Sequence, residues 1–143
     1  MPFSILGNMG CIFCGIVSGS IPAYTLYEDA HTLAFLDIHP NNPGHTLVIP
    51  KAHAANIYNI APSDLHTLMD TTQKMARAVK QAMEADGINL SMNNDQAAGQ
   101  IIFHAHMHVI PRFLHDGYKH WPQHSYPPDE AERITEKIKA AIT

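Results

Sequence analysis

Three histidines alternate with apolar residues along one short run, His104-Ala105-His106-Met107-His108. In an extended strand, successive side chains point to opposite faces of the sheet. The three imidazoles would therefore share one face, and the residues between them would form an apolar face toward the core. Consecutive rings on that face would lie about 6–7 Å apart, twice the rise per residue. A phosphate or a metal ion can be gripped between rings at this spacing, so the run predicts a functional site rather than a solvated strand.

The two cysteines of the chain, Cys11 and Cys14, have Cys-x-x-Cys spacing. In a protein of the cytoplasm such a pair is more often a metal-binding or redox element than a structural disulfide. The spacing alone leaves both readings open.

Size and composition bound the class of protein. The chain has 143 residues, 45% of them hydrophobic and 15% charged, which predicts one compact domain that needs no disulfides. A net charge of -4 argues against a broad grip on a nucleic acid polymer, while a small anionic ligand stays possible. No apolar run has the length of a membrane span, and residues 1–10 do not resemble a signal peptide. We therefore expect cytoplasmic residence, no membrane partner, and a leader at residues 1–10 that could be disordered.

Apolar periodicity and chain breakers predict the elements. Strands are expected over residues 24–28, 32–37, 45–49, 88–93 and 101–110, and helices over 11–17, 63–85 and 129–141. The helix over 63–85 has the strongest pattern, with Ser63 as its N-cap and Gly87 as its stop. Residues 113–128 look irregular. This order predicts an α+β domain on a mostly antiparallel sheet of about five strands, with one long central helix and a C-terminal helix.

Four segments together carry a resemblance to a known family. They are Cys11-Ile-Phe-Cys14, Asp37-Ile-His-Pro-Asn-Asn-Pro-Gly-His45, Pro50-Lys-Ala-His53 and Gly99-Gln-Ile-Ile-Phe-His-Ala-His-Met-His-Val-Ile-Pro-Arg112. From about Cys11 to Arg112 the chain resembles the histidine triad (HIT) superfamily, in particular its Hint-like bacterial branch of nucleotide hydrolases. The resemblance implies a single HIT-like domain over residues 11–143, extended from about residue 113, that binds a purine nucleotide (AMP-like) ligand.

The resemblance implies catalytic roles for His104, His106 and His108. His106 would attack the α-phosphorus of a nucleoside 5′-phosphate derivative and form a nucleotidyl-histidine, which water then hydrolyses. Neutral imidazole suits this role because its unperturbed pKa is about 6.5, and an acceptor on the other ring nitrogen would fix its tautomer. His108 would hydrogen-bond the α-phosphate and the leaving group.

The resemblance also implies a nucleotide-binding set from several loops. Its members are Asp37, Ile38, His39, Asn93, Gly99, Gln100, Ile101, His106 and His108, with His45 as a supporting residue. Asp37 would accept hydrogen bonds from the ribose hydroxyls, although it could instead cap the turn that follows it. The backbone amides at 99–101 would donate to phosphate, although Gly99 could merely shape its loop, and Asn93 could equally stabilise the adjoining loop.

A structural zinc site is implied at Cys11, Cys14, His53 and His104. Two thiolates and two imidazoles suit tetrahedral Zn²⁺, and four protein ligands leave no open position. The redox alternative for the cysteines is poor, because no thioredoxin-like βαβ pattern surrounds them.

Two positions depart from the family pattern. Ile101 stands where many relatives have Ser, Thr or Glu, so a side-chain hydroxyl near the leaving group is absent and we expect slower phosphoramidate cleavage. His39 replaces a small polar residue and would alter the fit of base or ribose.

Three function classes stay open. The first is a purine nucleoside phosphoramidase of the Hint type, which the cysteine pair and the chain length favour. The second is a dinucleoside polyphosphate hydrolase, and the third is a zinc-stabilised nucleotide-binding module without significant catalysis. A nucleotidyltransferase is less favoured because the related uridylyltransferases lack the third triad histidine, which is present here as His108. The resemblance also implies a homodimer with contacts through the helix at 63–85 and the strand from residue 88.

Overall fold

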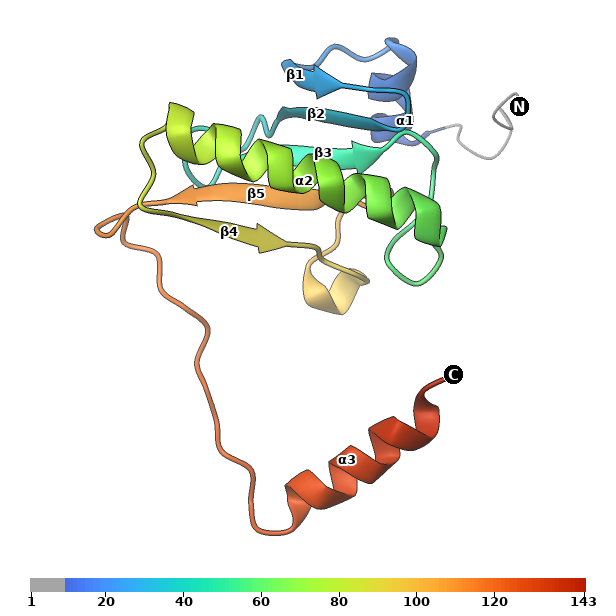
Figure 1. Cartoon of the computed structure of the whole chain (residues 1–143), viewed down its shortest axis with the longest axis vertical. Helices are drawn as coiled ribbons and strands as arrows, with labels where there is room; N and C mark the ends of the chain where they lie inside the picture. Colours follow the sequence, from blue (N-terminus) through green and yellow to red (C-terminus); the bar gives the residue numbers. More distant parts are fainter. Residues whose placement is uncertain (1–9) are drawn as a thin grey trace.

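The computed structural model describes residues 10–143, and its centre is a single antiparallel sheet (Figure 1). The order of the strands across the sheet is β1-β2-β3-β5-β4. Their bounds are β1 Thr25–Glu28, β2 Thr32–Leu36, β3 Thr46–Pro50, β4 Gly87–Ser91 and β5 Met107–Arg112. The predicted α+β class with five mostly antiparallel strands is confirmed. The prediction of a leader at residues 1–10 falls, except for Gly10, outside the described residues.

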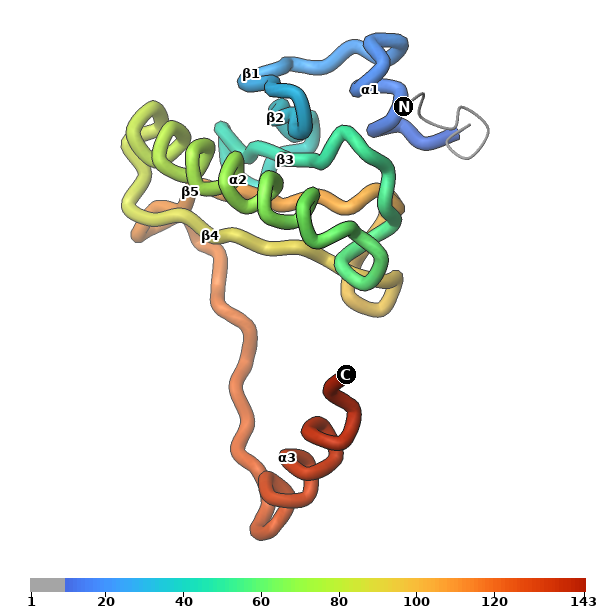
Figure 2. The backbone as a smooth tube through the Cα atoms, turned by 45° about the vertical axis from the view of Figure 1, so that its right-hand side comes forward, coloured from blue at the N-terminus to red at the C-terminus, as the bar shows by residue number. Residues whose placement is uncertain are grey.

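Three α-helices accompany the sheet: α1 Ile12–Ser18, α2 Pro62–Ala82 and α3 Glu130–Ala141, with a short 3₁₀ turn, η1, at Gln96–Ala98. The long helix α2 crosses one face of the sheet, as both views show (Figure 2). Helix α1 covers part of the opposite face through Phe13, which packs with Leu33, Phe35 and Leu47.

Covering both faces explains why β2 and β3 are almost wholly apolar. Along β2, Leu33 and Phe35 enter the cluster under α1, while Ala34 between them enters the cluster under α2. Strand β3 divides in the same way, with Val48 toward α2. In β5, Met107 and Val109 lie in the α2 cluster, so His108 points to the other face. The sheet thus directs the end of the histidine run away from the long helix.

The long helix starts and stops differently from the prediction. It begins at Pro62, with Ala61 as an N-cap that makes no side-chain hydrogen bond, so the expected cap at Ser63 is wrong. Proline at the first position is preorganised for a helix and lacks an N–H that would need a partner. The helix ends with Met83 as C-cap, and Gly87 lies in β4 rather than at the helix stop. The predicted inward stripe holds at its centre, where Leu68, Met75 and Val79 are buried.

The chain after β5 leaves the sheet as an extended segment and ends in α3, which stands apart from the sheet in both views (Figures 1 and 2). The irregular stretch predicted at 113–128 and the helix predicted at 129–141 match this course. Among the residues described, no helix is both long and apolar enough to cross a membrane.

Candidate active site and metal-binding cluster

The histidine run is only partly a strand. Strand β5 begins at Met107, so the predicted strand over 101–110 is wrong for residues 101–106, which are irregular. The side chain of Gln100 explains this course, because its amide nitrogen donates to the carbonyl oxygens of Ala55 (2.7 Å) and Ile102 (3.1 Å) and holds the chain in a loop. The expected apolar face is correspondingly incomplete: Ala105 and Met107 are buried, but Phe103 is 47% exposed.

His106 is held in one orientation by the backbone of its own segment. Its Nδ1 atom lies 2.7 Å from the carbonyl oxygen of His104. A carbonyl only accepts, so Nδ1 carries the proton and the lone pair of the neutral ring is on Nε2. The ring of Phe13 packs edge-on against it, with centroids 5.1 Å apart. Burial lowers the pKa of His106, which keeps the ring neutral. The residue is therefore a neutral imidazole with a free Nε2 electron pair.

The tautomer of His108 follows from a chain of two hydrogen bonds. The backbone N–H of Asn41 lies 3.1 Å from Nδ1 of His45, so this nitrogen accepts and the His45 proton is on Nε2. The His45 Nε2–H then donates to Nδ1 of His108, 2.9 Å away. His108 consequently carries its own proton on Nε2, where it can be donated. Burial, with smaller contributions from His106 and His45, lowers the pKa of His108 to about 4, so the ring is neutral at pH 7.

His106 and His108 lie side by side with complementary nitrogens. Their ring centroids are 5.0 Å apart, somewhat closer than the spacing expected for a regular strand. One ring offers a lone pair on Nε2 and the other a proton on Nε2. Such a pair can attack an electrophilic phosphorus and donate a hydrogen bond to the group that departs.

Asp37 lies at the edge of this histidine pair. Its Oδ1 accepts from the backbone N–H of His39 at 2.8 Å, which is the turn-capping contact considered from the sequence. Its Oδ2 lies 3.6 Å from Nε2 of His45. The carboxylate is 19% exposed, and Ile38 beside it is 70% exposed. Capping the turn and accepting from a ligand are therefore compatible at this position.

The loop before the histidine run offers fewer backbone donors than its sequence suggests. The amide of Gly99 donates to Gln96 O at 3.0 Å, and the amide of Gln100 donates to Asp95 O at 3.1 Å. Of the backbone amides of residues 99, 100 and 101, only that of Ile101 has no backbone acceptor among the described residues. Gly99 has φ +92°, and a Cβ there would lie 3.6 Å from the side-chain amide nitrogen of Asn93. The positive φ is what favours glycine here, and Asn93 lies at ordinary contact distance from it.

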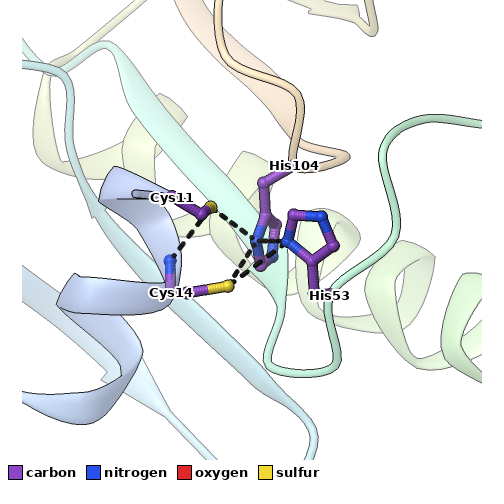
Figure 3. Close-up of side chains that lie close together, drawn as sticks. All are labelled: Cys11, Cys14, His53 and His104. Atoms are coloured by element: carbon purple, nitrogen blue, oxygen red, sulfur yellow. Dashed lines mark hydrogen bonds between the residues drawn. The ribbon is translucent and has the colours of Figure 1, made fainter. Parts of the chain in front are cut away.

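Four side chains converge on a second centre next to this pair (Figure 3). Cys11 and Cys14 come from the start of α1, His53 follows β3, and His104 precedes β5. Cys14 Sγ lies 3.3 Å from His53 Nδ1 and 3.5 Å from His104 Nδ1, and the two Nδ1 atoms are 3.3 Å apart. Tetrahedral Zn²⁺ with its usual bond lengths would place sulfur and nitrogen ligands about 3.3–3.6 Å apart. Cys11 Sγ lies 3.6 Å from His104 Nδ1, and all four donor atoms lie within 4.8 Å of one another, so the cluster suits a four-coordinate metal ion.

Protonation at this cluster also suits a cation. His104 Nε2 lies 2.7 Å from Pro50 O, so Nε2 carries the proton and Nδ1 is free to coordinate. Burial lowers the pKa of His104 to about 4, which leaves the ring neutral at pH 7. Burial and the neighbouring Cys11 raise the pKa of the Cys14 thiol to about 12, so the thiol is protonated at pH 7 in the absence of a cation. A bound cation would reverse this, because a metal ion deprotonates the thiols that coordinate it.

A further group of metal-ligand types, Asp37, His45 and His108, does not share this fit. The Asn41 amide fixes the proton of His45 on Nε2, the nitrogen that faces the other two side chains. A metal there would require the proton to move to Nδ1, against the amide donor. This group is therefore a hydrogen-bonded chain, and the cysteine cluster is the candidate metal-binding site.

The model of the HIT domain family matches residues 18–115 of this chain, which include the loop of Asp37 and the whole histidine run. The chain belongs to the HIT family. It is 43% identical to Protein hit of Bacillus subtilis over 132 residues, covering 90% of this chain and 91% of that protein.

Two solved HIT structures are informative beyond the fold. A Zn-bound histidine triad family protein from Mycobacterium smegmatis is similar with a TM-score of 0.74 and 37% identity, over 95% of this chain and 100% of that one. A histidine triad nucleotide-binding protein from Candida albicans is similar with a TM-score of 0.82 and 34% identity, over 92% of this chain and 96% of that one. HIT membership supports a role in nucleotide binding and hydrolysis.

Several residues that shape this HIT site escaped the sequence analysis. The carbonyl of Pro50 orients His104, the amide of Asn41 orients His45, and the ring of Phe13 packs against His106. The first two contacts are made by backbone atoms, which every residue has, so the residue type at these positions does not indicate them. The position of Phe13 between the two cysteines was the available signal.

Proposed function

We propose that this HIT protein hydrolyses purine nucleoside 5′-phosphoramidates at the α-phosphorus through a nucleotidyl-histidine at His106. The observation that carries the proposal is the hydrogen bond between His106 Nδ1 and His104 O at 2.7 Å. It leaves the Nε2 lone pair of a neutral imidazole as the reactive group in a partly buried site. An oriented, neutral ring of this kind is what nucleophilic catalysis needs near pH 7.

The first step forms a bond between Nε2 of His106 and the α-phosphorus and breaks the P–N bond to the leaving amine. The Nε2–H of His108 donates a hydrogen bond to the leaving nitrogen, which takes up a proton from the solvent and departs as the neutral amine, while the neutral His108 ring keeps its own proton. Charge on the phosphoryl oxygens would be met by the backbone N–H of Ile101. In the second step, water attacks phosphorus and breaks the bond to Nε2 of His106, the nucleoside monophosphate leaves, and the proton of the attacking water returns to the solvent.

The nucleoside would be recognised beside the Asp37 turn. The exposed part of the Asp37 carboxylate can accept from two ribose hydroxyls, and the exposed apolar face of Ile38 can cover a purine ring. His39 and Asn93 would complete this pocket from either side. The side chain of Gln100, which is 3% exposed, supports it by holding the loop rather than by touching the nucleotide.

The cysteine cluster would hold structural Zn²⁺ through Cys11, Cys14, His53 and His104. The ion would join α1 to the segment that carries the nucleophile and supply no reacting atom. His104 thus belongs to the catalytic histidines through its backbone carbonyl and to the zinc ligands through its ring.

Turnover of adenosine 5′-phosphoramidate by the wild type beside His106→Ala tests the proposal. We expect wild-type release of AMP and a loss of at least about 100-fold in the variant, a lower bound because removing a catalytic nucleophile can cost on the order of 10⁶-fold. His66→Ala is the matched control, since His66 is an exposed histidine of α2. Wild-type turnover of a dinucleoside polyphosphate alone would replace the substrate class, and nucleotide binding without turnover of either compound would overturn the proposal.

A further inference from the structure

The chain forms a hydrogen-bonded turn where it leaves β5, beginning at Arg112, the last residue of that strand. We define residues 112–118 as the strap. Arg112 at its start donates through Nε and Nη2 to the two carboxylate oxygens of Asp116, at 2.7 and 3.1 Å. The same carboxylate accepts from the backbone N–H groups of Phe113 at 3.1 Å and Tyr118 at 3.0 Å. A two-pronged guanidinium–carboxylate pair with two further donors makes a geometrically defined turn.

Tyr118 is the end of the strap that reaches across to another part of the fold. Its carbonyl oxygen accepts from Arg112 Nη2 at 3.1 Å, and its ring lies under the guanidinium carbon at 5.5 Å. Its hydroxyl donates to the carbonyl oxygen of Asn41 at 2.6 Å, a contact that joins residues 77 positions apart. The Tyr118 hydroxyl therefore links the strap to the loop between β2 and β3 by a hydrogen bond.

A second tie joins the strap to the same loop. The side-chain nitrogen of Asn42 donates to Pro111 O at 2.8 Å and to Asp116 Oδ2 at 3.1 Å. Asn41 and Asn42 are thus each held by the strap, one at its backbone carbonyl and one at its side chain. The loop contains Gly44, whose φ of +96° is a turn conformation that other residues rarely adopt.

Asn41 connects the strap to the histidines. Its carbonyl and its N–H belong to successive peptide groups, but both are part of this one residue. Asn41 receives Tyr118 at its carbonyl, and its own N–H donates to Nδ1 of His45 at 3.1 Å. His45 is 3% exposed and passes the constraint to His108 through Nε2 at 2.9 Å. A continuous path of contacts through Asn41 and His45 therefore runs from the Tyr118 hydroxyl to the His108 ring.

We propose that Tyr118 is a positioning residue: its hydroxyl holds Asn41 so that the Asn41 amide keeps the His45 proton on Nε2, which in turn keeps the His108 proton on Nε2, facing the leaving group. If the amide withdraws, His45 can carry its proton on Nδ1 instead. Its Nε2 then accepts, and His108 must donate from Nδ1 and present an unprotonated Nε2. That form of His108 has no hydrogen-bond donor for the departing amine.

This role rests on the proposed function for its kinetic consequence, but the tautomers can be measured without any substrate. Tyr118→Phe removes one oxygen atom and keeps the ring under Arg112. Tyr126→Phe is the matched control, because Tyr126 is an exposed tyrosine further along the same segment. Long-range ¹H–¹⁵N NMR of the ring nitrogens of zinc-loaded protein at pH 7 reports which nitrogen of His45 and His108 carries the proton.

We expect a single Nε2–H form of both rings in the wild type and in Tyr126→Phe, and a mixture of forms in Tyr118→Phe. Turnover of adenosine 5′-phosphoramidate by Tyr118→Phe should lose about 3- to 10-fold in kcat with KM within twofold, since the lost group acts on the hydrogen bond to the leaving nitrogen rather than on substrate binding. Asp116→Asn, which loosens the strap by a different route, should show the same pattern.

Unchanged tautomers with wild-type kcat in both strap variants would overturn the proposal, and so would an equal change in Tyr126→Phe. A wild type without turnover but with the tautomer shift in Tyr118→Phe would refute the proposed function and support the strap. Turnover in the wild type with no tautomer shift in either variant would refute the strap and leave the proposed function standing.

Discussion

The carbonyl oxygen of His104 lies 2.7 Å from Nδ1 of His106, while the ring of the same His104 lies among two cysteines and a histidine. One residue thus contributes its side chain to the metal-binding cluster and its backbone to the orientation of the neighbouring imidazole. The side chain that faces the cysteines and the acceptor that fixes the tautomer of His106 belong to the same residue. The cysteine cluster and the pair His106–His108 are therefore structurally connected through His104.

Protein purified without chelator is expected to contain about one zinc ion per chain. Cys14→Ser should lose most of that zinc, melt at a lower temperature and turn over more slowly, because removal of one of four ligands releases both α1 and His104. Metal analysis beside thermal unfolding makes the measurement, and His66→Ala should keep its zinc. A wild type free of zinc would contradict the assignment of the cluster.

Ile101→Ser should raise the rate of phosphoramidate cleavage. The side chain of Ile101 is 87% exposed, so the substitution disturbs little packing, and the new hydroxyl would lie near the leaving group. A gain of about fivefold is expected, the equivalent of one hydrogen bond of about 1 kcal/mol. Steady-state kinetics of Ile101→Ser and of the exposed control Ile142→Ser decide the matter, and equal rates in both and in the wild type would refute the idea.

Gly44→Ala should destabilise the protein by about 1–3 kcal/mol. The φ of Gly44 is +96°, and an added Cβ would lie 2.7 Å from Cγ of Met83. Gly87→Ala is the contrasting variant, because a Cβ there meets nothing within 4 Å and its φ is not positive. Urea denaturation of the two variants should separate them clearly, and similar midpoints would show that the turn is not strained.

The sequence predicted those parts of the fold that depend on side-chain type. Alternating and continuous apolar runs located the five strands, and the cysteine spacing together with the family resemblance named the four residues that the structure brings together at the metal-binding cluster. The predicted N-cap failed at Ser63 because Pro62, one residue earlier, already provides the helix start. For the strands and for the four clustered residues, the information lay in residue types at fixed spacings.

The failures depend on backbone atoms and long-range contacts. The run from Ile101 to His106 has the alternation of a strand, yet the Gln100 side chain ties the chain into a loop through carbonyls at Ala55 and Ile102. The Asn41 amide donates to the ring of His45, and the Tyr118 hydroxyl donates to the carbonyl oxygen of Asn41 across 77 positions of the chain. Periodicity reports local preference and cannot show which backbone donor meets which ring.

The most direct test of the central claim is to trap the covalent intermediate. Wild-type protein mixed with adenosine 5′-phosphoramidate and quenched within the first turnover should gain the mass of one adenylyl group, mapped by peptide mass spectrometry to His106 and absent from His106→Ala. Adenylylation of another residue, or full turnover with no adduct on His106 at any quench time, would contradict the account.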